Sequence, residues 1–340
     1  MKKYLINEGG NFYKANLHCH STFSDGVKTP EQLKELYMSM GYSIIAFTEH
    51  DVLIPQDQVT DENFLALHGF EVEILKGGAR TPYEIKTCHI CFIGLDPENI
   101  IQPFWHRTLY VGNNAKYHKH LVKFDENEPD YVRVYSGEAI TKMMQEAREK
   151  GFFVTYNHPT WSLETYPDYI GYNGMHAMEM YNGGALTDGF LDYNPRVYDD
   201  MLMDGKRLYC IGADDNHNWA DPPSRKCDAG RAWTMIKADK LEYRTITKAI
   251  EEGQFYASEG PEIYELYVED GKVHIKCSAA DRIHCTYGAR HAEIAANEDR
   301  SPVTEAAFNM NPDWKYFRIT VVDNSGKTAC TNAYFFDELQ

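Results

Sequence analysis

The stretch Asn16-Leu-His-Cys-His-Ser-Thr-Phe-Ser-Asp-Gly26 contains two histidines that are two residues apart in an apolar-flanked run. If this run is a β-strand, His18 and His20 project from the same face, because side chains alternate along a strand. Two neutral imidazoles side by side suit a borderline divalent ion such as zinc. The turn Ser24-Asp25-Gly26 adds a carboxylate at the same strand end. The stretch therefore predicts a metal site where the strand ends.

The sequence that follows predicts a helix and then a second strand with a similar ending. Thr29-Pro-Glu31 offers an N-cap and a first helical residue, and Gly41 ends the helix. Residues 43–47 form a short apolar run that indicates a buried strand, and it leads into Thr48-Glu-His-Asp51. In an α/β barrel the C-terminal strand ends carry the chemistry. We therefore expect this second ending to lie near the first histidine pair.

Four later segments predict strands that contain or end in further histidines and carboxylates. These segments are residues 63–71, 87–93, 152–156 and 208–211. The residues in question are Glu71, His89, His158, and the pair Asp215 and His217, which are two apart. Glu179 lies inside another predicted strand, and we interpret it as structural.

These motifs resemble those of the PHP (polymerase and histidinol phosphatase) domain, a superfamily of metal-dependent phosphoesterases. The resemblance rests on His18-Cys-His20 with Ser24-Asp25-Gly26, on Thr48-Glu-His-Asp51 and on the Asp215-x-His217 spacing. It covers roughly residues 13–260. It implies that Glu71 bridges two metal ions and that Asp25 occupies the position of a third-site ligand. The implied ligands are His18, His20, Asp25, His50, Glu71, His89, His158, Asp215 and His217.

Nitrogen and oxygen donors in this number exceed what one tetrahedral ion with an open position can use. They suit two or three divalent ions that share a carboxylate. Zinc, manganese and iron all accept mixed histidine and carboxylate ligands. The expected cofactor is therefore two or three ions of zinc, manganese or iron.

The sequence also contains the cysteine motif Cys88-His-Ile-Cys91. This spacing can indicate a zinc site. However, residues three apart on a strand face opposite sides. We therefore do not expect a thiolate zinc site there.

The resemblance implies an α/β fold for residues 1–261, a distorted (β/α)7 TIM-like barrel. Residues 96–135 do not follow a βα pattern, and we expect either an insertion that covers the site or a surface excursion. From residue 262 onward, short alternating segments separated by turns predict a small antiparallel β-sandwich over residues 262–340. Residues 253–261 resemble the ending of the carbaryl-hydrolase-like (CehA/McbA) branch of the family.

Composition disfavours several classes of function. Hydrophobic residues make up 43% of the chain and charged residues 25%, and the formal net charge is −17. Such a charge disfavours non-specific binding to nucleic acid or to an anionic membrane. Tyr4-Leu-Ile6 is too short for a signal-peptide core, and we find no run of about eighteen apolar residues. With only eight cysteines in the chain, the sequence favours a reduced, cytoplasmic protein.

We interpret the sequence as that of a metal-dependent phosphoesterase that hydrolyses a small phosphate ester with a metal-bridged hydroxide. The same nucleophile could attack a carbonyl carbon, so a carboxyl-ester or carbamate hydrolase of the CehA/McbA type is an alternative, and a non-catalytic metal-binding module is another. Asp51 and His217 are the predicted proton carriers. Arg107, His120 and Arg231 are the predicted substrate-binding residues. The expected partner is a small phosphorylated molecule, and the oligomeric state stays open.

Overall fold

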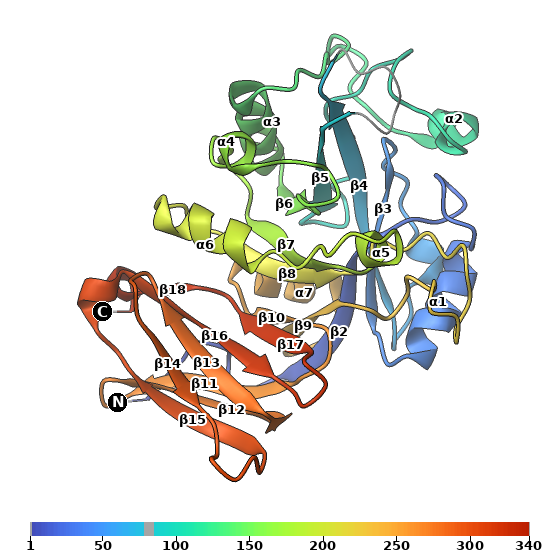
Figure 1. Cartoon of the computed structure of the whole chain (residues 1–340). Helices are drawn as coiled ribbons and strands as arrows, with labels where there is room; N and C mark the ends of the chain where they lie inside the picture. The colour runs from blue at the N-terminus through green and yellow to red at the C-terminus, as the bar shows by residue number, and fades with distance from the viewer. Residues whose placement is uncertain (1, 78–84, 340) are drawn as a thin grey trace.

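A computed structural model describes residues 2–77 and 85–339 of the chain (Figure 1). The first part of the chain mixes strands and helices, in the order β1 (Lys3–Tyr4), β2 (Asn11–Cys19), α1 (Pro30–Ser39), β3 (Ile44–His50), β4 (Leu65–Leu75), β5 (Thr87–Gly94), α2 (Ala115–His118), α3 (Gly137–Glu149), β6 (Phe152–Asn157), α4 (Tyr166–Tyr169), β7 (Ala177–Asn182), α5 (Gly183–Thr187), α6 (Pro195–Met203), β8 (Tyr209–Ala213), β9 (Trp233–Ala238), α7 (Tyr243–Glu251) and β10 (Phe255–Ser258). The rest is mainly strand: β11 (Ile263–Glu269), β12 (Lys272–Ala280), β13 (Arg282–Tyr287), β14 (Ala292–Ala295), β15 (Val303–Asn309), β16 (Tyr316–Val322), β17 (Thr328–Thr331) and β18 (Tyr334–Phe335).

Strands β2 to β8 form the part of the large sheet that carries the predicted ligands. β2, β3 and β4 are parallel neighbours, as are β6, β7 and β8, while β5 lies antiparallel between β4 and β6. The register pairs His50 with Glu71 and Glu73 with His89. Because the carboxyl ends of parallel strands meet at one edge of a sheet, donors from distant parts of the sequence gather there.

The sheet departs from seven regular βα units. Residues 76–86 connect β4 to β5, and a connection this short favours an antiparallel return, since a parallel crossover takes about a dozen residues or more. β8 is the last strand in the order of the large sheet, but the chain that follows it returns beside β2. There the Asp215 amide donates to the His18 carbonyl at 2.9 Å, and the His20 amide donates to the Asn216 carbonyl at 3.2 Å. Closure of the whole sheet into a barrel stays a prediction.

The predicted helix after the first histidine pair is confirmed as α1. Its N-cap is Thr29, whose hydroxyl accepts a hydrogen bond from the Gln32 amide, while the Gln32 side chain accepts one from the Thr29 amide. This reciprocal pair satisfies amides that the first turn leaves without partners. Leu33 and Tyr37 are buried against the sheet, so the helix fixes the path from the end of β2 to the start of β3.

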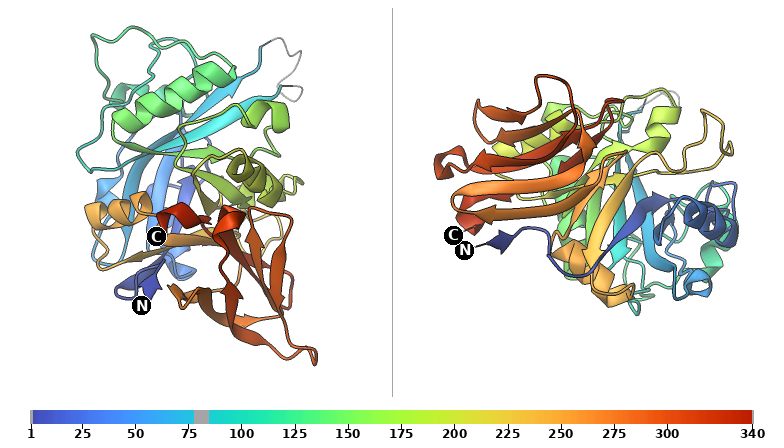
Figure 2. Two further views of the ribbon diagram at one scale, coloured as in Figure 1. Left: turned by 90° about the vertical axis from the view of Figure 1, so that its left-hand side faces the viewer. Right: turned by 90° about the horizontal axis from the view of Figure 1, so that it is seen from below.

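The strands from β11 onward form two antiparallel sheets that share an apolar core (Figure 2). One sheet has the order β1-β11-β12-β15, and the other continues the large sheet through β17, β16, β13 and β14. Ile263, Ile275 and Ile319 are among the side chains that fill the space between them. The strands are antiparallel, as the alternating segments predict.

The predicted division at residue 261 stays a prediction. β10 pairs with β9 along one edge and with β17 along the other, so one sheet runs through both parts of the chain. β1 falls in the first predicted domain but pairs with β11 of the second. The two ends of the described chain also lie close together, with Lys3 Nζ 3.4 Å from the Glu338 carbonyl oxygen (Figure 2).

The predicted insertion, residues 96–135, contains α2 and packs against the segment that follows β3. Trp105, Ala115 and Val122 form a small apolar cluster with Val52 and Ile54. Near the end of the insertion, Arg133 Nη2 lies 2.6 Å from Asp51 Oδ1. The insertion is therefore anchored beside the end of β3.

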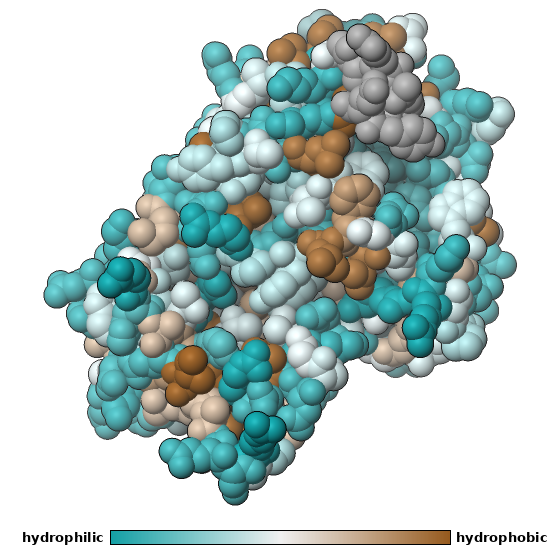
Figure 3. All heavy atoms as spheres, viewed as in Figure 1, coloured by the Kyte–Doolittle hydropathy of each residue, from teal (hydrophilic) through white to brown (hydrophobic). Residues whose placement is uncertain are grey.

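The face of the molecule in Figure 3 is mainly hydrophilic, with hydrophobic residues in small separate groups. This is the ordinary distribution for a protein surface. Among the helices in the described ranges, none combines the length and the apolar character that crossing a membrane requires.

Candidate metal centre

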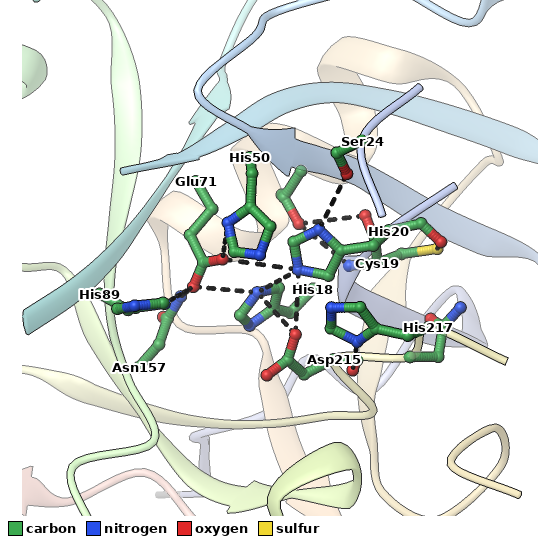
Figure 4. A network of polar contacts seen from close by, with 12 residues as sticks. His18, Cys19, His20, Ser24, His50, Glu71, His89, Asn157, Asp215 and His217 are labelled. Carbon is green, nitrogen blue, oxygen red and sulfur yellow. Dashed lines mark hydrogen bonds and ion pairs between the residues drawn. The ribbon is translucent and has the colours of Figure 1, made fainter. Parts of the chain in front are cut away.

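The strand ends bring imidazoles and carboxylates into one network (Figure 4). Within each of four groups, three of which share members, one donor atom of every residue lies within 4.8 Å of the others. The groups are His20, Asp25, His50 and His217; His18, His158 and Asp215; Glu71, His89 and His158; and His18, Glu71 and Cys91. Every ligand that the resemblance implies belongs to at least one of them.

The innermost contacts join two imidazoles to two carboxylates. His18 Nε2 lies 3.1 Å from His20 Nε2, 3.2 Å from Glu71 Oε1 and 3.1 Å from Asp215 Oδ1. His20 Nε2 lies 3.0 Å from the same Asp215 oxygen. Both histidines and Glu71 are buried. Donor atoms this close together fit a shared cation, because zinc binds nitrogen and oxygen at about 2 Å.

Glu179, which we expected to be structural, orients His18. Its Oε1 lies 2.7 Å from His18 Nδ1, and its Oε2 accepts a hydrogen bond from the His158 amide at 2.9 Å. A carboxylate at one ring nitrogen fixes the tautomer and directs the lone pair of the other nitrogen toward a metal. The sequence signal was present: a glutamate inside an apolar strand must find a partner once it is buried.

A second group lies nearer the solvent. His50 Nδ1 is 3.0 Å from Glu71 Oε2, and its Nε2 is 3.4 Å from Asp25 Oδ2. His217 Nε2 is 3.3 Å from Asp25 Oδ1. The side chains of His50, Asp25 and His217 are 19 to 25% exposed, so this group faces the outside of the network.

The third group is built on the other oxygen of Glu71. His89 Nδ1 lies 2.9 Å and His158 Nε2 3.3 Å from Glu71 Oε1. The second nitrogen of His89 faces Glu73 at 3.4 Å. Glu71 thus contacts an imidazole in the innermost set of contacts, in the set nearer the solvent and in this third set. This is the arrangement that a bridging carboxylate requires.

The electrostatics of the network fit divalent cations. Burial would raise the pKa of Glu71, but the charges of His18, His89 and His50 hold it well below the usual range. Burial, followed by the charges of His50 and His217, lowers the pKa of His20 to about 4. Glu71 Oε2 is buried and has no hydrogen-bond partner among the described residues. Cations would supply the positive charge that this network otherwise needs from protons.

Three of the residues predicted to handle protons or substrate have partners of their own. Asp51 is buried and paired with Arg133. Arg107 pairs with Asp130, and the Arg231 guanidinium donates to the Cys227 and Arg225 carbonyls. His120 is exposed in the insertion. Arg107, His120 and Arg231 do not belong to the described lining of the cavity above the network. The sequence could not show this, because a pattern of basic residues does not reveal which carboxylates or carbonyls they contact.

A cavity of about 660 Å³ opens above the network. Asp25, His50, Glu71, His89, His158, Asp215 and His217 form part of its surface, as do Asp51 and Glu73. The walls further out include Tyr110, Trp161, Asp188, Trp219 and Lys226. A small molecule in this cavity would meet the donor network at its floor and aromatic rings at its sides.

The fold and the network define an α/β protein with a candidate metal centre. The family model of the PHP domain matches residues 16–209, so the chain belongs to the PHP domain family. The matched segment runs from Asn16, within β2, through β7 to the first residue of β8, and it contains all predicted ligands except Asp215 and His217.

Individual known proteins match this chain either over a short segment or at low sequence identity. A 5'-3' exoribonuclease from Haemophilus influenzae is 32% identical over 84 residues, which are 24% of this chain and 29% of that protein. A crystal structure of a two-domain protein containing a predicted PHP-like metal-dependent phosphoesterase from Bacteroides vulgatus is 18% identical, covers 98% of both chains and has a TM-score of 0.44. An amidohydrolase from Chromobacterium violaceum is 17% identical over 71% of this chain and 96% of its own, with a TM-score of 0.35. The resemblance to the carbaryl-hydrolase-like branch stays a prediction.

Proposed function

We propose that the chain is a metal-dependent phosphoesterase that hydrolyses a phosphate ester of a small molecule. Membership of the PHP domain family supports a metal-dependent reaction. The observation that carries the proposal is that three donor groups share Glu71, His18 and His158, and that Glu71 and His158 line one open cavity. A single structural ion would need neither so many donors nor access to the outside.

Two or three divalent ions fit the network, held by the nine predicted ligands. When bound in such a site, divalent ions lower the pKa of a water toward neutrality and offset charge on a phosphoryl oxygen. Glu179 fixes the ring of His18, and Glu71 sets the spacing between the groups. The walls of the cavity hold the ester group above this floor, which lowers the entropy cost of reaching the transition state.

The leaving group needs a proton, and the two predicted carriers differ in position. His217 Nε2 faces Asp25 within a candidate ligand group. A ring nitrogen that binds a cation cannot also hold a proton for the substrate. Asp51 lines the same cavity but belongs to none of the candidate groups among the described residues. We therefore assign the role of proton donor to Asp51, whose carboxylate is positioned by Arg133.

The test compares para-nitrophenyl phosphate, its phosphodiester analogue and para-nitrophenyl acetate, using protein loaded with manganese or zinc. Turnover of a phosphate ester that is lost in Glu71→Gln and on chelation supports the proposal. A surface variant such as Glu146→Gln is the matched control and should keep full turnover. Turnover of the acetate without release of phosphate would overturn the ranking.

One observation favours an ester hydrolase of the carboxyl or carbamate type as the second candidate. Among the described residues that line the cavity, Lys226 is the one lysine and arginine is absent, whereas Glu73, Asp188 and Asp228 add negative charge. Bound cations would have to offset this field for a phosphate dianion. A neutral ester would not meet this repulsion, and the acetate substrate measures the difference.

A further inference from the structure

Cys91 on β5 shares the face of the strand that carries His89, because the two residues are two apart. Cys88 lies on the opposite face and packs in an apolar core with Phe92 and Phe152. The two cysteines therefore do not form one site, as we expected from their spacing. The alternation that separates them nevertheless places Cys91 against the metal centre.

The sulfur of Cys91 lies among candidate ligands. Cys91 Sγ, a ring nitrogen of His18 and a carboxylate oxygen of Glu71 all lie within 4.8 Å of one another. The three residues are buried. The span from nitrogen through zinc to sulfur is at most about 4.4 Å, the sum of the two bond lengths. Little movement is needed for all three atoms to bind one ion.

Two further contacts indicate that this position holds a ligand. Glu71 Oε2 is buried and forms no hydrogen bond among the described residues, although His50 Nδ1 lies 3.0 Å from it, so the carboxylate keeps an acceptor for a cation. In addition, Asn157 Nδ2 lies 2.9 Å from Cys91 Sγ and 3.3 Å from Glu71 Oε1. An amide that donates to two ligand atoms at once is the kind of outer contact that orients metal ligands.

We propose that Cys91 is a sulfur ligand of the innermost metal ion, together with His18 and Glu71. The proposal rests on the metal centre of the proposed function but not on the reaction catalysed there. A cysteine binds as the thiolate, so loading with metal releases the thiol proton to solvent. Sulfur favours zinc and other borderline ions over manganese and magnesium, which prefer oxygen. Cys91 would therefore bias the inner site toward zinc, or toward iron(II).

The test titrates metal-free, full-length protein with cobalt(II), a spectroscopic substitute for zinc. We compare the wild-type chain with Cys91→Ser and with the matched control Cys88→Ser from the other face of β5. The wild type and the control should show the sulfur-to-cobalt charge-transfer band in the near ultraviolet, and Cys91→Ser should lack it. Cys91→Ser should also bind zinc about tenfold more weakly or worse, while its manganese affinity changes less.

A charge-transfer band of full intensity in Cys91→Ser would overturn the proposal, as would a wild-type chain that binds cobalt stoichiometrically without the band. Circular dichroism and thermal unfolding show whether each variant is folded. If Cys91→Ser does not fold, Cys91→Ala and the wild-type spectrum decide the question. Because the readout is spectroscopic, a chain that shows the band but hydrolyses no phosphate ester would contradict the proposed function and leave the sulfur ligand in place.

Discussion

Two regions of the molecule bury different kinds of side chain. One is the edge of the sheet that holds the donor network, and the other is the set of strands from β11 onward. Around Glu71 the buried groups are titratable, and one of its oxygens lacks a hydrogen bond within the described residues. Between the two later sheets the buried side chains are mainly aliphatic and aromatic. Burying charge costs free energy unless the charge is compensated, whereas burying apolar surface is favourable. The first region therefore depends on what it binds, and the second on its own packing.

This difference means that activity and stability should respond to different substitutions. The largest effect is expected for Glu71→Gln, which should lower turnover about 1000-fold or more. The metal-free variant should unfold at a urea concentration close to that of the metal-free wild type, because the histidines around Glu71 can lose their protons once the carboxylate is gone, so that no buried charge is left alone. Steady-state turnover and urea unfolding measure the two effects. Retained turnover would remove the bridging role of Glu71.

The converse change lies in the core of the C-terminal strands. Phe317 on β16 is buried there, and Phe317→Ala should lower the free energy of unfolding by about 3–5 kcal/mol. Metal content per folded molecule should not change. Ile294→Ala on β14, where the side chain is 62% exposed, is the control and should stay within about 0.5 kcal/mol of the wild type. A loss of bound metal in Phe317→Ala well below its melting temperature would contradict the separation.

The two regions also differ in how far the sequence predicts them. His18 and His20 could be placed from alternation along one strand, and the later histidines from their positions at strand ends. The antiparallel strands after residue 262 followed from alternating segments and turns. What these features share is a local pattern, which short-range rules describe well.

Partners that are distant in sequence could not be predicted in the same way. Glu179 meets His18 across 161 positions, and Arg133, near the end of the insertion, meets Asp51, which precedes the insertion in the chain. The local pattern shows that Glu179 needs a partner once it is buried, but it does not show which partner, and nothing local distinguishes Arg133 from a surface arginine. For the same reason Arg107, His120 and Arg231 were predicted at the site although they do not line the cavity. Strand β5 returns antiparallel to β4, so the described sheet departs from regular βα units there.

The orienting role of Glu179 gives a smaller effect than the loss of a ligand. Glu179→Gln keeps the shape of the side chain but removes the charge beside His18 Nδ1, and zinc affinity should fall about 10–100-fold. Glu73→Gln makes the matched comparison. Its carboxylate lies 3.4 Å from His89 Nε2 and is 38% exposed, so the fall should be smaller. Competition with a chromophoric chelator measures both affinities, and an equal or larger effect at Glu73 would contradict the assignment.

The smallest effect is expected from a buried carboxylate remote from the donor network. Glu164 accepts hydrogen bonds from the hydroxyls of Tyr135, Tyr156 and Tyr172. Burial raises its pKa, although these hydrogen bonds lower it and offset part of the rise. The folded state therefore keeps a proton that the unfolded chain releases at lower pH, so this contribution to stability is complete below the ordinary pKa of glutamate and is lost as the pH rises through the raised value.

Glu164→Gln removes this titration without removing the side chain. The free energy of unfolding of the wild type, relative to that of Glu164→Gln, should fall as the pH is raised from about 4 to neutral pH. Urea unfolding of both metal-free proteins across this range measures the difference and cancels the titration of the donor network, which both proteins share. A difference that stays constant or grows with pH would mean that the three tyrosines fully compensate the buried charge. The chain would then hold this buried charge with hydrogen bonds alone, without the proton that the raised pKa indicates.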